Sequence, residues 1–175
     1  MIVLICGLSG AGKTTLAQNV KKKLTLYGKS AEIIDGDEYR KTLFKELSYT
    51  EQDRIENIRR LGFIAGKFSK HNIITIISAI NPFKEMRDEL LQVYSNVKIV
   101  YVDCPVDVLI SRDTKGLYAK ALLPDGHPDK LYNLTGINDR FDVPENPDLH
   151  INSGVQTIDE SAGVLFDFII RQANY

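Results

Sequence analysis

The chain has 175 residues, of which 43% are apolar and 26% charged, so it suits one compact domain over residues 1–175 and excludes collagen-like, coiled-coil and disordered chains. The 22 basic and 23 acidic residues nearly cancel, which argues against a nucleic acid polymer or a membrane surface as partner and favours a small molecule. No apolar run approaches the ~18 residues that span a bilayer, and the first run lacks a secretory cleavage site, so we expect a cytoplasmic protein.

Short apolar runs alternate with helical patterns along the chain, an order typical of α/β domains with a parallel sheet. These runs are rich in Val, Ile and Leu, as expected for strands that are covered on both faces. We therefore predict a five-stranded, mainly parallel sheet with helices on both faces. The predicted strands cover residues 2–6, 31–34, 72–80, 97–102 and 149–151.

The first run leads into a glycine-rich loop, GLSGAGKT, which matches the pattern G-x-x-x-x-G-K-[ST] between a strand and a helix. Glycines let main-chain N–H groups surround phosphate oxygens, and the helix start adds partial positive charge. Lys13 then reaches the β- and γ-phosphates, and the Thr14 hydroxyl binds Mg²⁺. The motif predicts a P-loop NTPase or kinase fold with ATP and Mg²⁺ as cofactors. The expected ATP-binding residues are Gly7, Ser9, Gly10, Ala11, Gly12, Lys13, Thr14 and Thr15.

Two carboxylates, Asp35 and Asp37, follow the second run, at the strand end that faces the ligand crevice of a doubly wound sheet. A carboxylate there can orient Mg²⁺ or accept the proton of an attacking hydroxyl, although Asp-Gly-Asp is also common in ordinary turns. The N-K-x-D segment with which GTPases recognise guanine is missing from the sequence. A kinase is therefore favoured over a GTPase, and also over an ATP-driven motor, which is usually a larger chain.

The helices are predicted from their periodicity and their start signals. A first helix over residues 13–26 ends near Gly28. Four more begin at a capping residue followed by an acidic residue or proline. These pairs are Thr50 with Asp53, Asn81 with Pro82, Cys104 with Pro105, and Thr157 with Glu160. Residues 114–148 contain four prolines and little periodicity, and so long an irregular segment is usually functional, so we expect a lid over the active site.

Six segments together resemble the adenylylsulfate (APS) kinase family over nearly the whole chain. They are residues 7–15, 35–40 (DGDEYR), 54–60 (RIENIRR), 81–88 (NPFKEMRD), 112–121 (RDTKGLYAKA) and 134–138 (LTGIN). Family members transfer the γ-phosphate of ATP to the ribose 3′-hydroxyl of APS, giving 3′-phosphoadenylylsulfate (PAPS) and ADP. The resemblance implies catalytic roles for Lys13, Asp35 and Asp37, with Asp37 beside the acceptor hydroxyl and Asp35, with Thr14, near Mg²⁺. It also implies that Arg112 contacts ATP and that the acceptor nucleotide is bound by Asp37, Arg40, Tyr49, Arg54, Asn57, Ile80, Asn81, Lys115, Lys120 and Leu134.

Arg54 and Asn57 also support this site independently, because residues three apart lie on one face of a helix and can reach one ligand. The guanidinium of arginine suits phosphate or sulfate oxygens. The alternative is an ordinary solvated helix face, on which Arg54 pairs with the acidic residues around it.

Three departures from the family pattern fall on the acceptor side. Asn81 stands where many members have a serine that can carry a phosphoryl group, which excludes a covalent serine route at this position, and Asn81 is expected to cap a helix. Leu134 stands where a phenylalanine usually faces Tyr49 across the adenine, and residues 122–130 are longer than their counterpart in the family. Two alternatives therefore stay open: a 3′-hydroxyl kinase for another nucleotide, such as cytidine diphosphoramidate in capsule modification, and, more remotely, a non-catalytic nucleotide-binding module. A homodimer is also left open.

Overall fold

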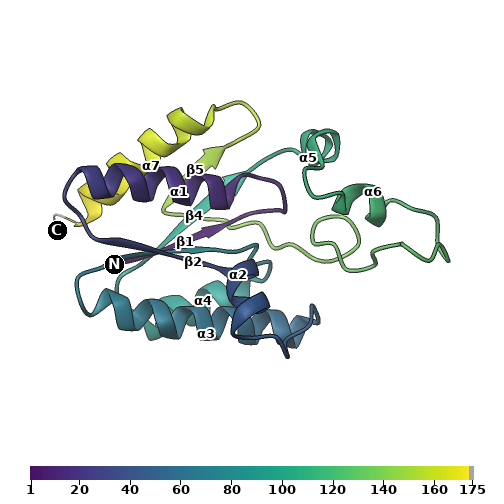
Figure 1. Ribbon diagram of the computed structural model, residues 1–175, viewed down its shortest axis with the longest axis horizontal. Helices are drawn as coiled ribbons and strands as arrows, with labels where there is room; N and C mark the ends of the chain where they lie inside the picture. Colours follow the sequence, from purple (N-terminus) through teal and green to yellow (C-terminus); the bar gives the residue numbers. More distant parts are fainter. Residues whose placement is uncertain (174–175) are drawn as a thin grey trace.

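The computed structural model describes residues 1–173. The strands are β1 (Ile2–Cys6), β2 (Ala31–Asp35), β3 (Ile74–Ser78), β4 (Val97–Asp103) and β5 (Leu149–Asn152). They form one sheet in the order β2-β3-β1-β4-β5, and every neighbouring pair is parallel (Figure 1). The sheet confirms the predicted α/β architecture. The third strand was predicted over residues 72–80 and is shorter at both ends, because residues 72 and 73 lie in the preceding turn and residues 79 and 80 in the following loop.

The helices are α1 (Lys13–Leu26), α2 (Gly36–Thr42), α3 (Glu51–Ser69), α4 (Lys84–Val93), α5 (Val106–Arg112), α6 (Leu117–Ala121) and α7 (Ile158–Ala173). One face of the sheet carries α1 and α7, and the other carries α3 and α4 (Figure 1). Because side chains alternate along a strand, β1 contributes to two cores: Val3 and Ile5 pack with residues of α1 and α7, whereas Ile2 and Leu4 pack with residues of α3 and α4. β1 is thus buried on both faces.

The parallel order determines where polar residues gather. Since β1 lies between β3 and β4, the loops that leave β1, β2 and β3 meet at the carboxyl edge of the sheet. In open α/β sheets this edge holds the ligand crevice. The P-loop, α2 and residues 79–82 are therefore neighbours, as the site geometry below requires.

Two helix starts agree with the sequence prediction. The hydroxyl of Thr50 accepts from the N–H of Asp53 and begins α3. Thr157 and Glu160 form a reciprocal capping box before α7, with main-chain N–H to side-chain distances of 2.8 and 3.3 Å. At the end of α1, Gly28 has a φ of +78°, the conformation expected after a helix terminus.

Two other predicted starts are wrong. Asn81 does not cap a helix, because its φ of +47° is left-handed, whereas an N-cap residue is extended. α4 begins at Lys84, whose N–H donates to Asp142 Oδ2 at 2.9 Å. α5 follows Pro105 with no side-chain cap, so Cys104 does not fill this role either.

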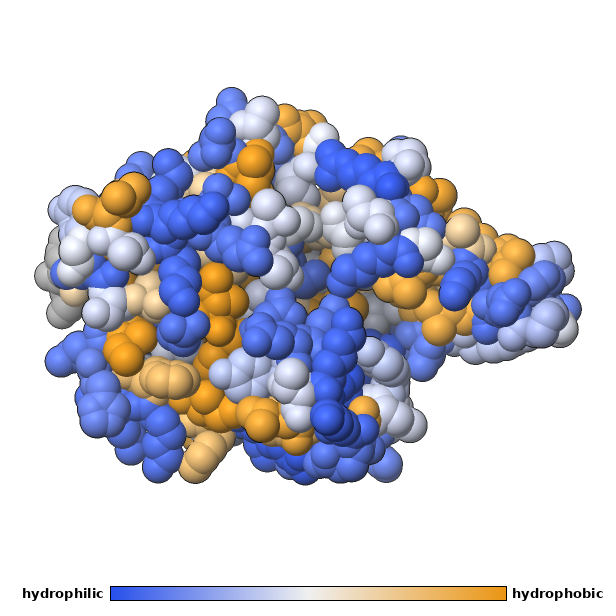
Figure 2. Space-filling view, viewed as in Figure 1, coloured by the Kyte–Doolittle hydropathy of each residue, from blue (hydrophilic) through white to orange (hydrophobic). Residues whose placement is uncertain are grey.

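Residues 114–148 contain only the short helix α6 and one isolated bridge, between Thr135 and Asp139. Part of this segment forms a lobe that projects beyond the layers of the sheet, with mixed polar and apolar colouring (Figure 2). Whether the lobe opens and closes as a lid stays a prediction. Cys6 and Cys104 are both buried, and neither forms a disulfide. Within residues 1–173, no helix is both long enough and apolar enough to cross a membrane.

Candidate active site

The P-loop encloses a cavity of about 220 Å³ at the carboxyl edge of the sheet, called the central cavity below. Gly10 and Gly12 have φ values of +79° and +89°, which other residues rarely adopt. Gly7 is required for another reason, because a Cβ there would lie 2.2 Å from the carbonyl oxygen of Val102. The cavity is lined by Ser9, Gly10 and residues 12–15, by Asp35 and Asp37, by residues 78–80, and by Thr114 and Lys115. Gly7 and Ala11 belong to the P-loop but do not line the central cavity.

Lys13 lies at the base of the central cavity. Its side chain is buried, and Nζ donates to the carbonyl oxygen of Leu8 at 2.8 Å. Burial lowers the pKa of Lys13 from 10.5 to about 8, and the negative charge of Asp37 opposes this shift. The ammonium group is therefore still charged at neutral pH, but its burial is unfavourable. An anion bound in the cavity would offset that cost.

Thr14 and Asp35 lie together, as predicted for a metal pair. Thr14 Oγ1 donates to Asp35 Oδ2 at 2.7 Å and is 3.2 Å from Ser78 Oγ. The other carboxylate oxygen of Asp35 accepts from the N–H groups of Asp37 and Glu38, so Asp35 is also the N-cap of α2. This second contact fixes the orientation of the carboxylate. Hydroxyl and carboxylate oxygens are the ligand type that Mg²⁺ prefers.

Asp37 faces the P-loop from the first turn of α2. Lys115 Nζ, from the segment 114–148, lies 2.9 Å from Asp37 Oδ2. Burial acts to raise the pKa of Asp37, but the hydrogen bond from Lys115 and its charge outweigh burial and hold that pKa below its usual range. Asp37 is therefore ionised at neutral pH, and the irregular segment already contacts the candidate catalytic carboxylate.

A second cavity of about 50 Å³, called the small cavity below, adjoins the central one. The two cavities share Asp37, Ala79 and Ile80. The small cavity brings together most of the predicted acceptor-binding residues from four parts of the chain. Besides Asp37 and Ile80, these are Arg40, Tyr49, Arg54, Asn57 and Asn81.

The two arginines of the small cavity are both buried. Arg40 donates to the carbonyl oxygen of Ser48, and its guanidinium lies 4.9 Å from the centre of the Tyr49 ring. Arg54 pairs with Asp139 at 3.2 Å and not with the acidic residues of its own helix. Arg54 also donates to the carbonyl oxygens of Tyr49 and Asn133, and to the Thr135 hydroxyl, at 2.7–3.0 Å. Arg54 thus lines the cavity and fastens the segment 114–148 to α3, a role that the sequence did not indicate.

Two predicted acceptor residues lie elsewhere. Leu134 is 4% exposed, packs in the core on the α1 and α7 side, and does not line the small cavity. Tyr49 is half exposed and lines the small cavity, so of these two side chains only Tyr49 lies at this cavity. Lys120, on α6, is exposed and lines neither the central nor the small cavity.

A third cavity of about 360 Å³, called the side cavity below, is lined by four of the predicted ATP-binding residues, Ala11, Gly12, Thr15 and Arg112, and by others that were not predicted. It shares Gly12 and Thr15 with the central cavity and lies at the start of α7. Arg112 donates to the carbonyl oxygen of Ser153 at 3.2 Å, and the buried Ser161 hydroxyl has no hydrogen-bond partner within residues 1–173. The capping box at Thr157 marked the helix start in the sequence, but gave no indication that this start borders the P-loop.

The site combines a P-loop and its lysine, a hydroxyl–carboxylate pair and an adjoining cavity lined by arginines. Together these features define a P-loop phosphotransferase. A family model described as adenylylsulphate kinase matches residues 1–152. The adenylyl-sulfate kinase of Deinococcus deserti is 40% identical over 96% of this chain and 90% of its own. The chain therefore belongs to the adenylylsulphate kinase family, whose members are kinases.

Solved structures agree with this family assignment. The Mycobacterium tuberculosis APS kinase in complex with AMPPNP and APS superposes with a TM-score of 0.89, at 34% identity over 97% of this chain and 96% of that one. A hexameric APS kinase from Thiobacillus denitrificans gives a TM-score of 0.70 at 25% identity, over 98% of this chain and 29% of that one. The similarity therefore covers both the candidate site and the layers that support it.

Proposed function

We propose that the protein is an ATP-dependent adenylylsulfate kinase that produces PAPS and ADP. The observation that carries the proposal is the position of Asp37, which lines both the central and the small cavity. A nucleotide whose anionic end lies against Arg40 and Arg54 can present a ribose hydroxyl to Asp37 while ATP phosphates occupy the P-loop. The APS complex of the M. tuberculosis relative supports APS as that nucleotide.

In the proposed reaction the 3′-oxygen of APS bonds to the γ-phosphorus of ATP as the bond from that phosphorus to the β–γ bridging oxygen breaks. ADP carries away the electron pair. Asp37 is ionised and accepts the hydroxyl proton, which it later releases to water. Lys13 and the P-loop N–H groups stabilise the charge that develops on the transferred group. Lys115, 2.9 Å from Asp37, adds a second positive charge beside the reacting atoms.

Thr14 and Asp35 are the residues proposed to hold Mg²⁺. Their oxygens are 2.7 Å apart at the mouth of the P-loop, and phosphate oxygens and water would complete the shell, as is usual for this ion. Bound Mg²⁺ neutralises charge on the β- and γ-phosphates. The adenosine of ATP is proposed to occupy the side cavity beside Arg112, since Gly12 and Thr15 of the P-loop line that cavity as well as the central one.

The test is an ATP-consumption assay with purified full-length protein and a panel of acceptors: APS, cytidine diphosphoramidate, CDP and dephospho-coenzyme A. We expect APS to give the highest kcat/KM, and phosphorus NMR to locate the new phosphate on the 3′-oxygen. Lys13→Ala is the matched control, because it removes one phosphate contact from the same fold. If APS gives no turnover above that control, the proposed function is wrong.

The comparisons do not favour the alternative acceptor, cytidine diphosphoramidate, because the relatives described above are named for APS. The assay panel keeps that acceptor as a direct competitor. Homo-oligomer formation is proposed from the hexameric relative, and light scattering of the purified protein would test it. The cytoplasmic location stays a prediction.

A further inference from the structure

Tyr118, on α6, is buried with its hydroxyl against the backbone of the P-loop. The residue is 2% exposed and belongs to the core on the α1 and α7 side. Its hydroxyl donates to the carbonyl oxygen of Ser9 at 2.8 Å. Burial raises the pKa of Tyr118 to about 12, so the hydroxyl keeps its proton at neutral pH. A phenylalanine would fill the same space without burying a polar group, which is costly unless it is paired.

This hydrogen bond fixes the peptide group between Ser9 and Gly10. Within residues 1–173 no peptide bond is cis, and in a planar trans peptide the C=O and N–H groups point in opposite directions. Ser9 and Gly10 line the central cavity, whereas Tyr118 does not. With the Ser9 carbonyl held toward Tyr118, the Gly10 N–H is directed toward the cavity. Among residues 1–173 this N–H has no hydrogen-bond acceptor, so it is free for a phosphate oxygen.

The preceding carbonyl of the loop is held differently. The carbonyl oxygen of Leu8 accepts from Lys13 Nζ at 2.8 Å and from the N–H of Ala11 at 3.3 Å. Lys13 is also the proposed phosphate ligand, so its bond to Leu8 competes with nucleotide binding. The bond from Tyr118 does not compete, because Tyr118 lies outside the central cavity. It can therefore hold the loop in one conformation both before and after ATP binds.

The backbone of Tyr118 is itself fixed by Asp113. The carboxylate of Asp113 accepts from the N–H groups of Tyr118 and Ala119 at 3.1 and 2.9 Å. The carbonyl oxygen of Asp113 accepts from the N–H of Gly116 at 2.9 Å, which closes the turn that carries Lys115. The position of the hydroxyl is thus determined by the start of α6 and not by the P-loop alone.

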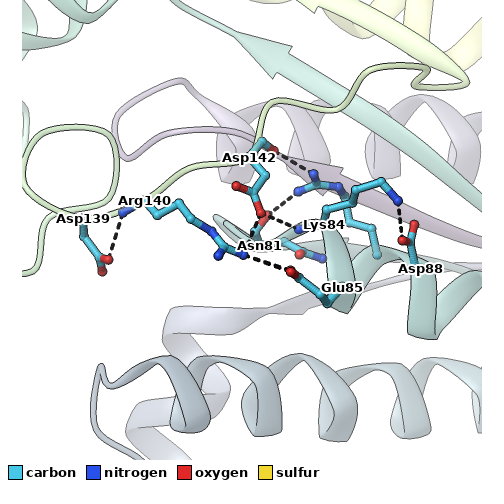
Figure 3. A network of polar contacts seen from close by, with 8 residues as sticks. Asn81, Lys84, Glu85, Asp88, Asp139, Arg140 and Asp142 are labelled. Atoms are coloured by element: carbon cyan, nitrogen blue, oxygen red, sulfur yellow. Dashed lines mark hydrogen bonds and ion pairs between the residues drawn. The ribbon is translucent and has the colours of Figure 1, made fainter.

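The far end of the segment 114–148 is anchored separately, at the start of α4 (Figure 3). The carboxylate of Asp142 accepts from the N–H of Lys84 and from Arg140, both at 2.9 Å. The carbonyl oxygen of Asp142 accepts from Arg87 Nη2 at 2.7 Å. These contacts do not involve Tyr118, so they remain when its hydroxyl is removed. An effect of removing the hydroxyl is then local to the P-loop and does not come from release of the whole segment.

We propose that Tyr118 is a positioning residue for the P-loop, and that its hydroxyl orients the Ser9–Gly10 peptide so that the Gly10 N–H donates to a phosphate oxygen of ATP. This inference rests on the proposed function only in that ATP phosphates occupy the P-loop, and it requires no particular acceptor. A donor that is already oriented needs no reorganisation when the phosphate arrives. Without the hydroxyl, binding would have to order this peptide group at a cost in conformational entropy.

Tyr118→Phe tests the proposal, because it keeps the buried ring and removes only the hydroxyl. We expect the Kd for AMPPNP with Mg²⁺, measured by calorimetry, to rise at least about fivefold, since a hydrogen bond to a charged group is typically worth more than that. The KM for APS should stay within about twofold. If the Kd for AMPPNP is unchanged, with or without a lower melting temperature, the hydroxyl serves the fold alone and the proposal is overturned. A higher KM for APS with an unchanged Kd for AMPPNP also overturns it.

Tyr132→Phe is the matched control in the same irregular segment. The Tyr132 hydroxyl accepts from the N–H of Gly126 at 3.0 Å, and its side chain does not line the central cavity. The Kd for AMPPNP should stay within about twofold of the wild type. If both tyrosine variants weaken AMPPNP binding equally, the effect is general to the segment and the proposal is overturned.

The amide signal of Gly10 in a proton–nitrogen NMR spectrum gives a readout that a purely structural role would not move. Saturating AMPPNP should shift the Gly10 amide proton downfield in the wild type and by less in Tyr118→Phe, while the Gly12 amide responds alike in both. If the Gly10 signal does not respond in the wild type, the proposal is overturned whatever the stability of the variant. Neither binding nor NMR needs an acceptor, so a protein that passes both tests but does not turn over APS overturns the proposed function alone.

Discussion

Replacing Lys13 by methionine should make the protein more stable and almost inactive. Methionine has a similar length and flexibility but carries no charge. The pKa of Lys13 is about 8 instead of 10.5, and each pKa unit corresponds to 1.36 kcal/mol, so the buried charge costs about 3 kcal/mol at neutral pH. Losing the hydrogen bond to Leu8 removes about 1 kcal/mol of stabilisation. The net expectation for Lys13→Met is a gain of about 2 kcal/mol.

The assay is thermal and urea unfolding of the two proteins without nucleotide, followed by turnover measurements. A gain of about 2 kcal/mol corresponds to roughly 4–8 °C for a chain of this size, and kcat should fall at least about 100-fold because transition-state charge is no longer stabilised. The difference in stability also depends on pH. The stability gain of Lys13→Met has its full size below pH 8 and disappears between pH 8 and 10.5. In that range the folded wild type has lost the lysine proton, whereas the unfolded chain still holds it.

The matched control is Lys22→Met on the same helix, where no comparable burial applies and stability should change by less than about 0.5 kcal/mol. The reasoning is refuted if Lys13→Met melts below the wild type at pH 7. It is also refuted if the stability difference is the same at pH 7 and pH 10, because the cost would then not come from the buried charge.

Three further substitutions test other parts of the structure. Asp37→Asn should lower kcat at least about 100-fold by removing the proton acceptor, with ATP affinity from calorimetry nearly unchanged; unchanged kcat would leave Asp37 only a turn residue. Thr157→Ala should cost about 1 kcal/mol in urea unfolding through loss of the α7 cap, and an unchanged midpoint would contradict the reciprocal bonds. Leu134→Phe should overpack the core and cost about 1–3 kcal/mol, whereas a lower KM for APS without loss of stability would place Leu134 at the base after all.

The sequence predicted the parts of the fold that depend on local patterns. Apolar runs predicted the parallel sheet, because strands covered on both faces contain few polar residues. The complete P-loop motif predicted the position of Lys13 and Thr14, since its glycines require positive φ values that define the loop. The N-cap at Thr50 and the capping box at Thr157 were also predicted correctly, because the bonded residues lie within one helical turn.

What the sequence missed depends on contacts between distant segments. The start of α4 is capped by Asp142, 58 residues further along the chain, so no local pattern could reveal it. Arg54 lies on the predicted helix face, but its partners Thr135 and Asp139 come from the irregular segment. Leu134 was assigned to the acceptor through family resemblance, whereas its own environment is the core. The helices α2 and α6 were not predicted, because their 7 and 5 residues are too few for a periodic pattern.

The cap that Asp142 provides to α4 also ties the opening of the irregular segment to the fraying of a helix. If residues 139–142 lift away from the protein, the Lys84 amide loses its acceptor and the first turn of α4 loses its cap. Amide hydrogens exchange with solvent when such local openings occur. Exchange at Lys84 would then report the motion of a distant loop, and ligands that hold the loop down would slow exchange inside α4.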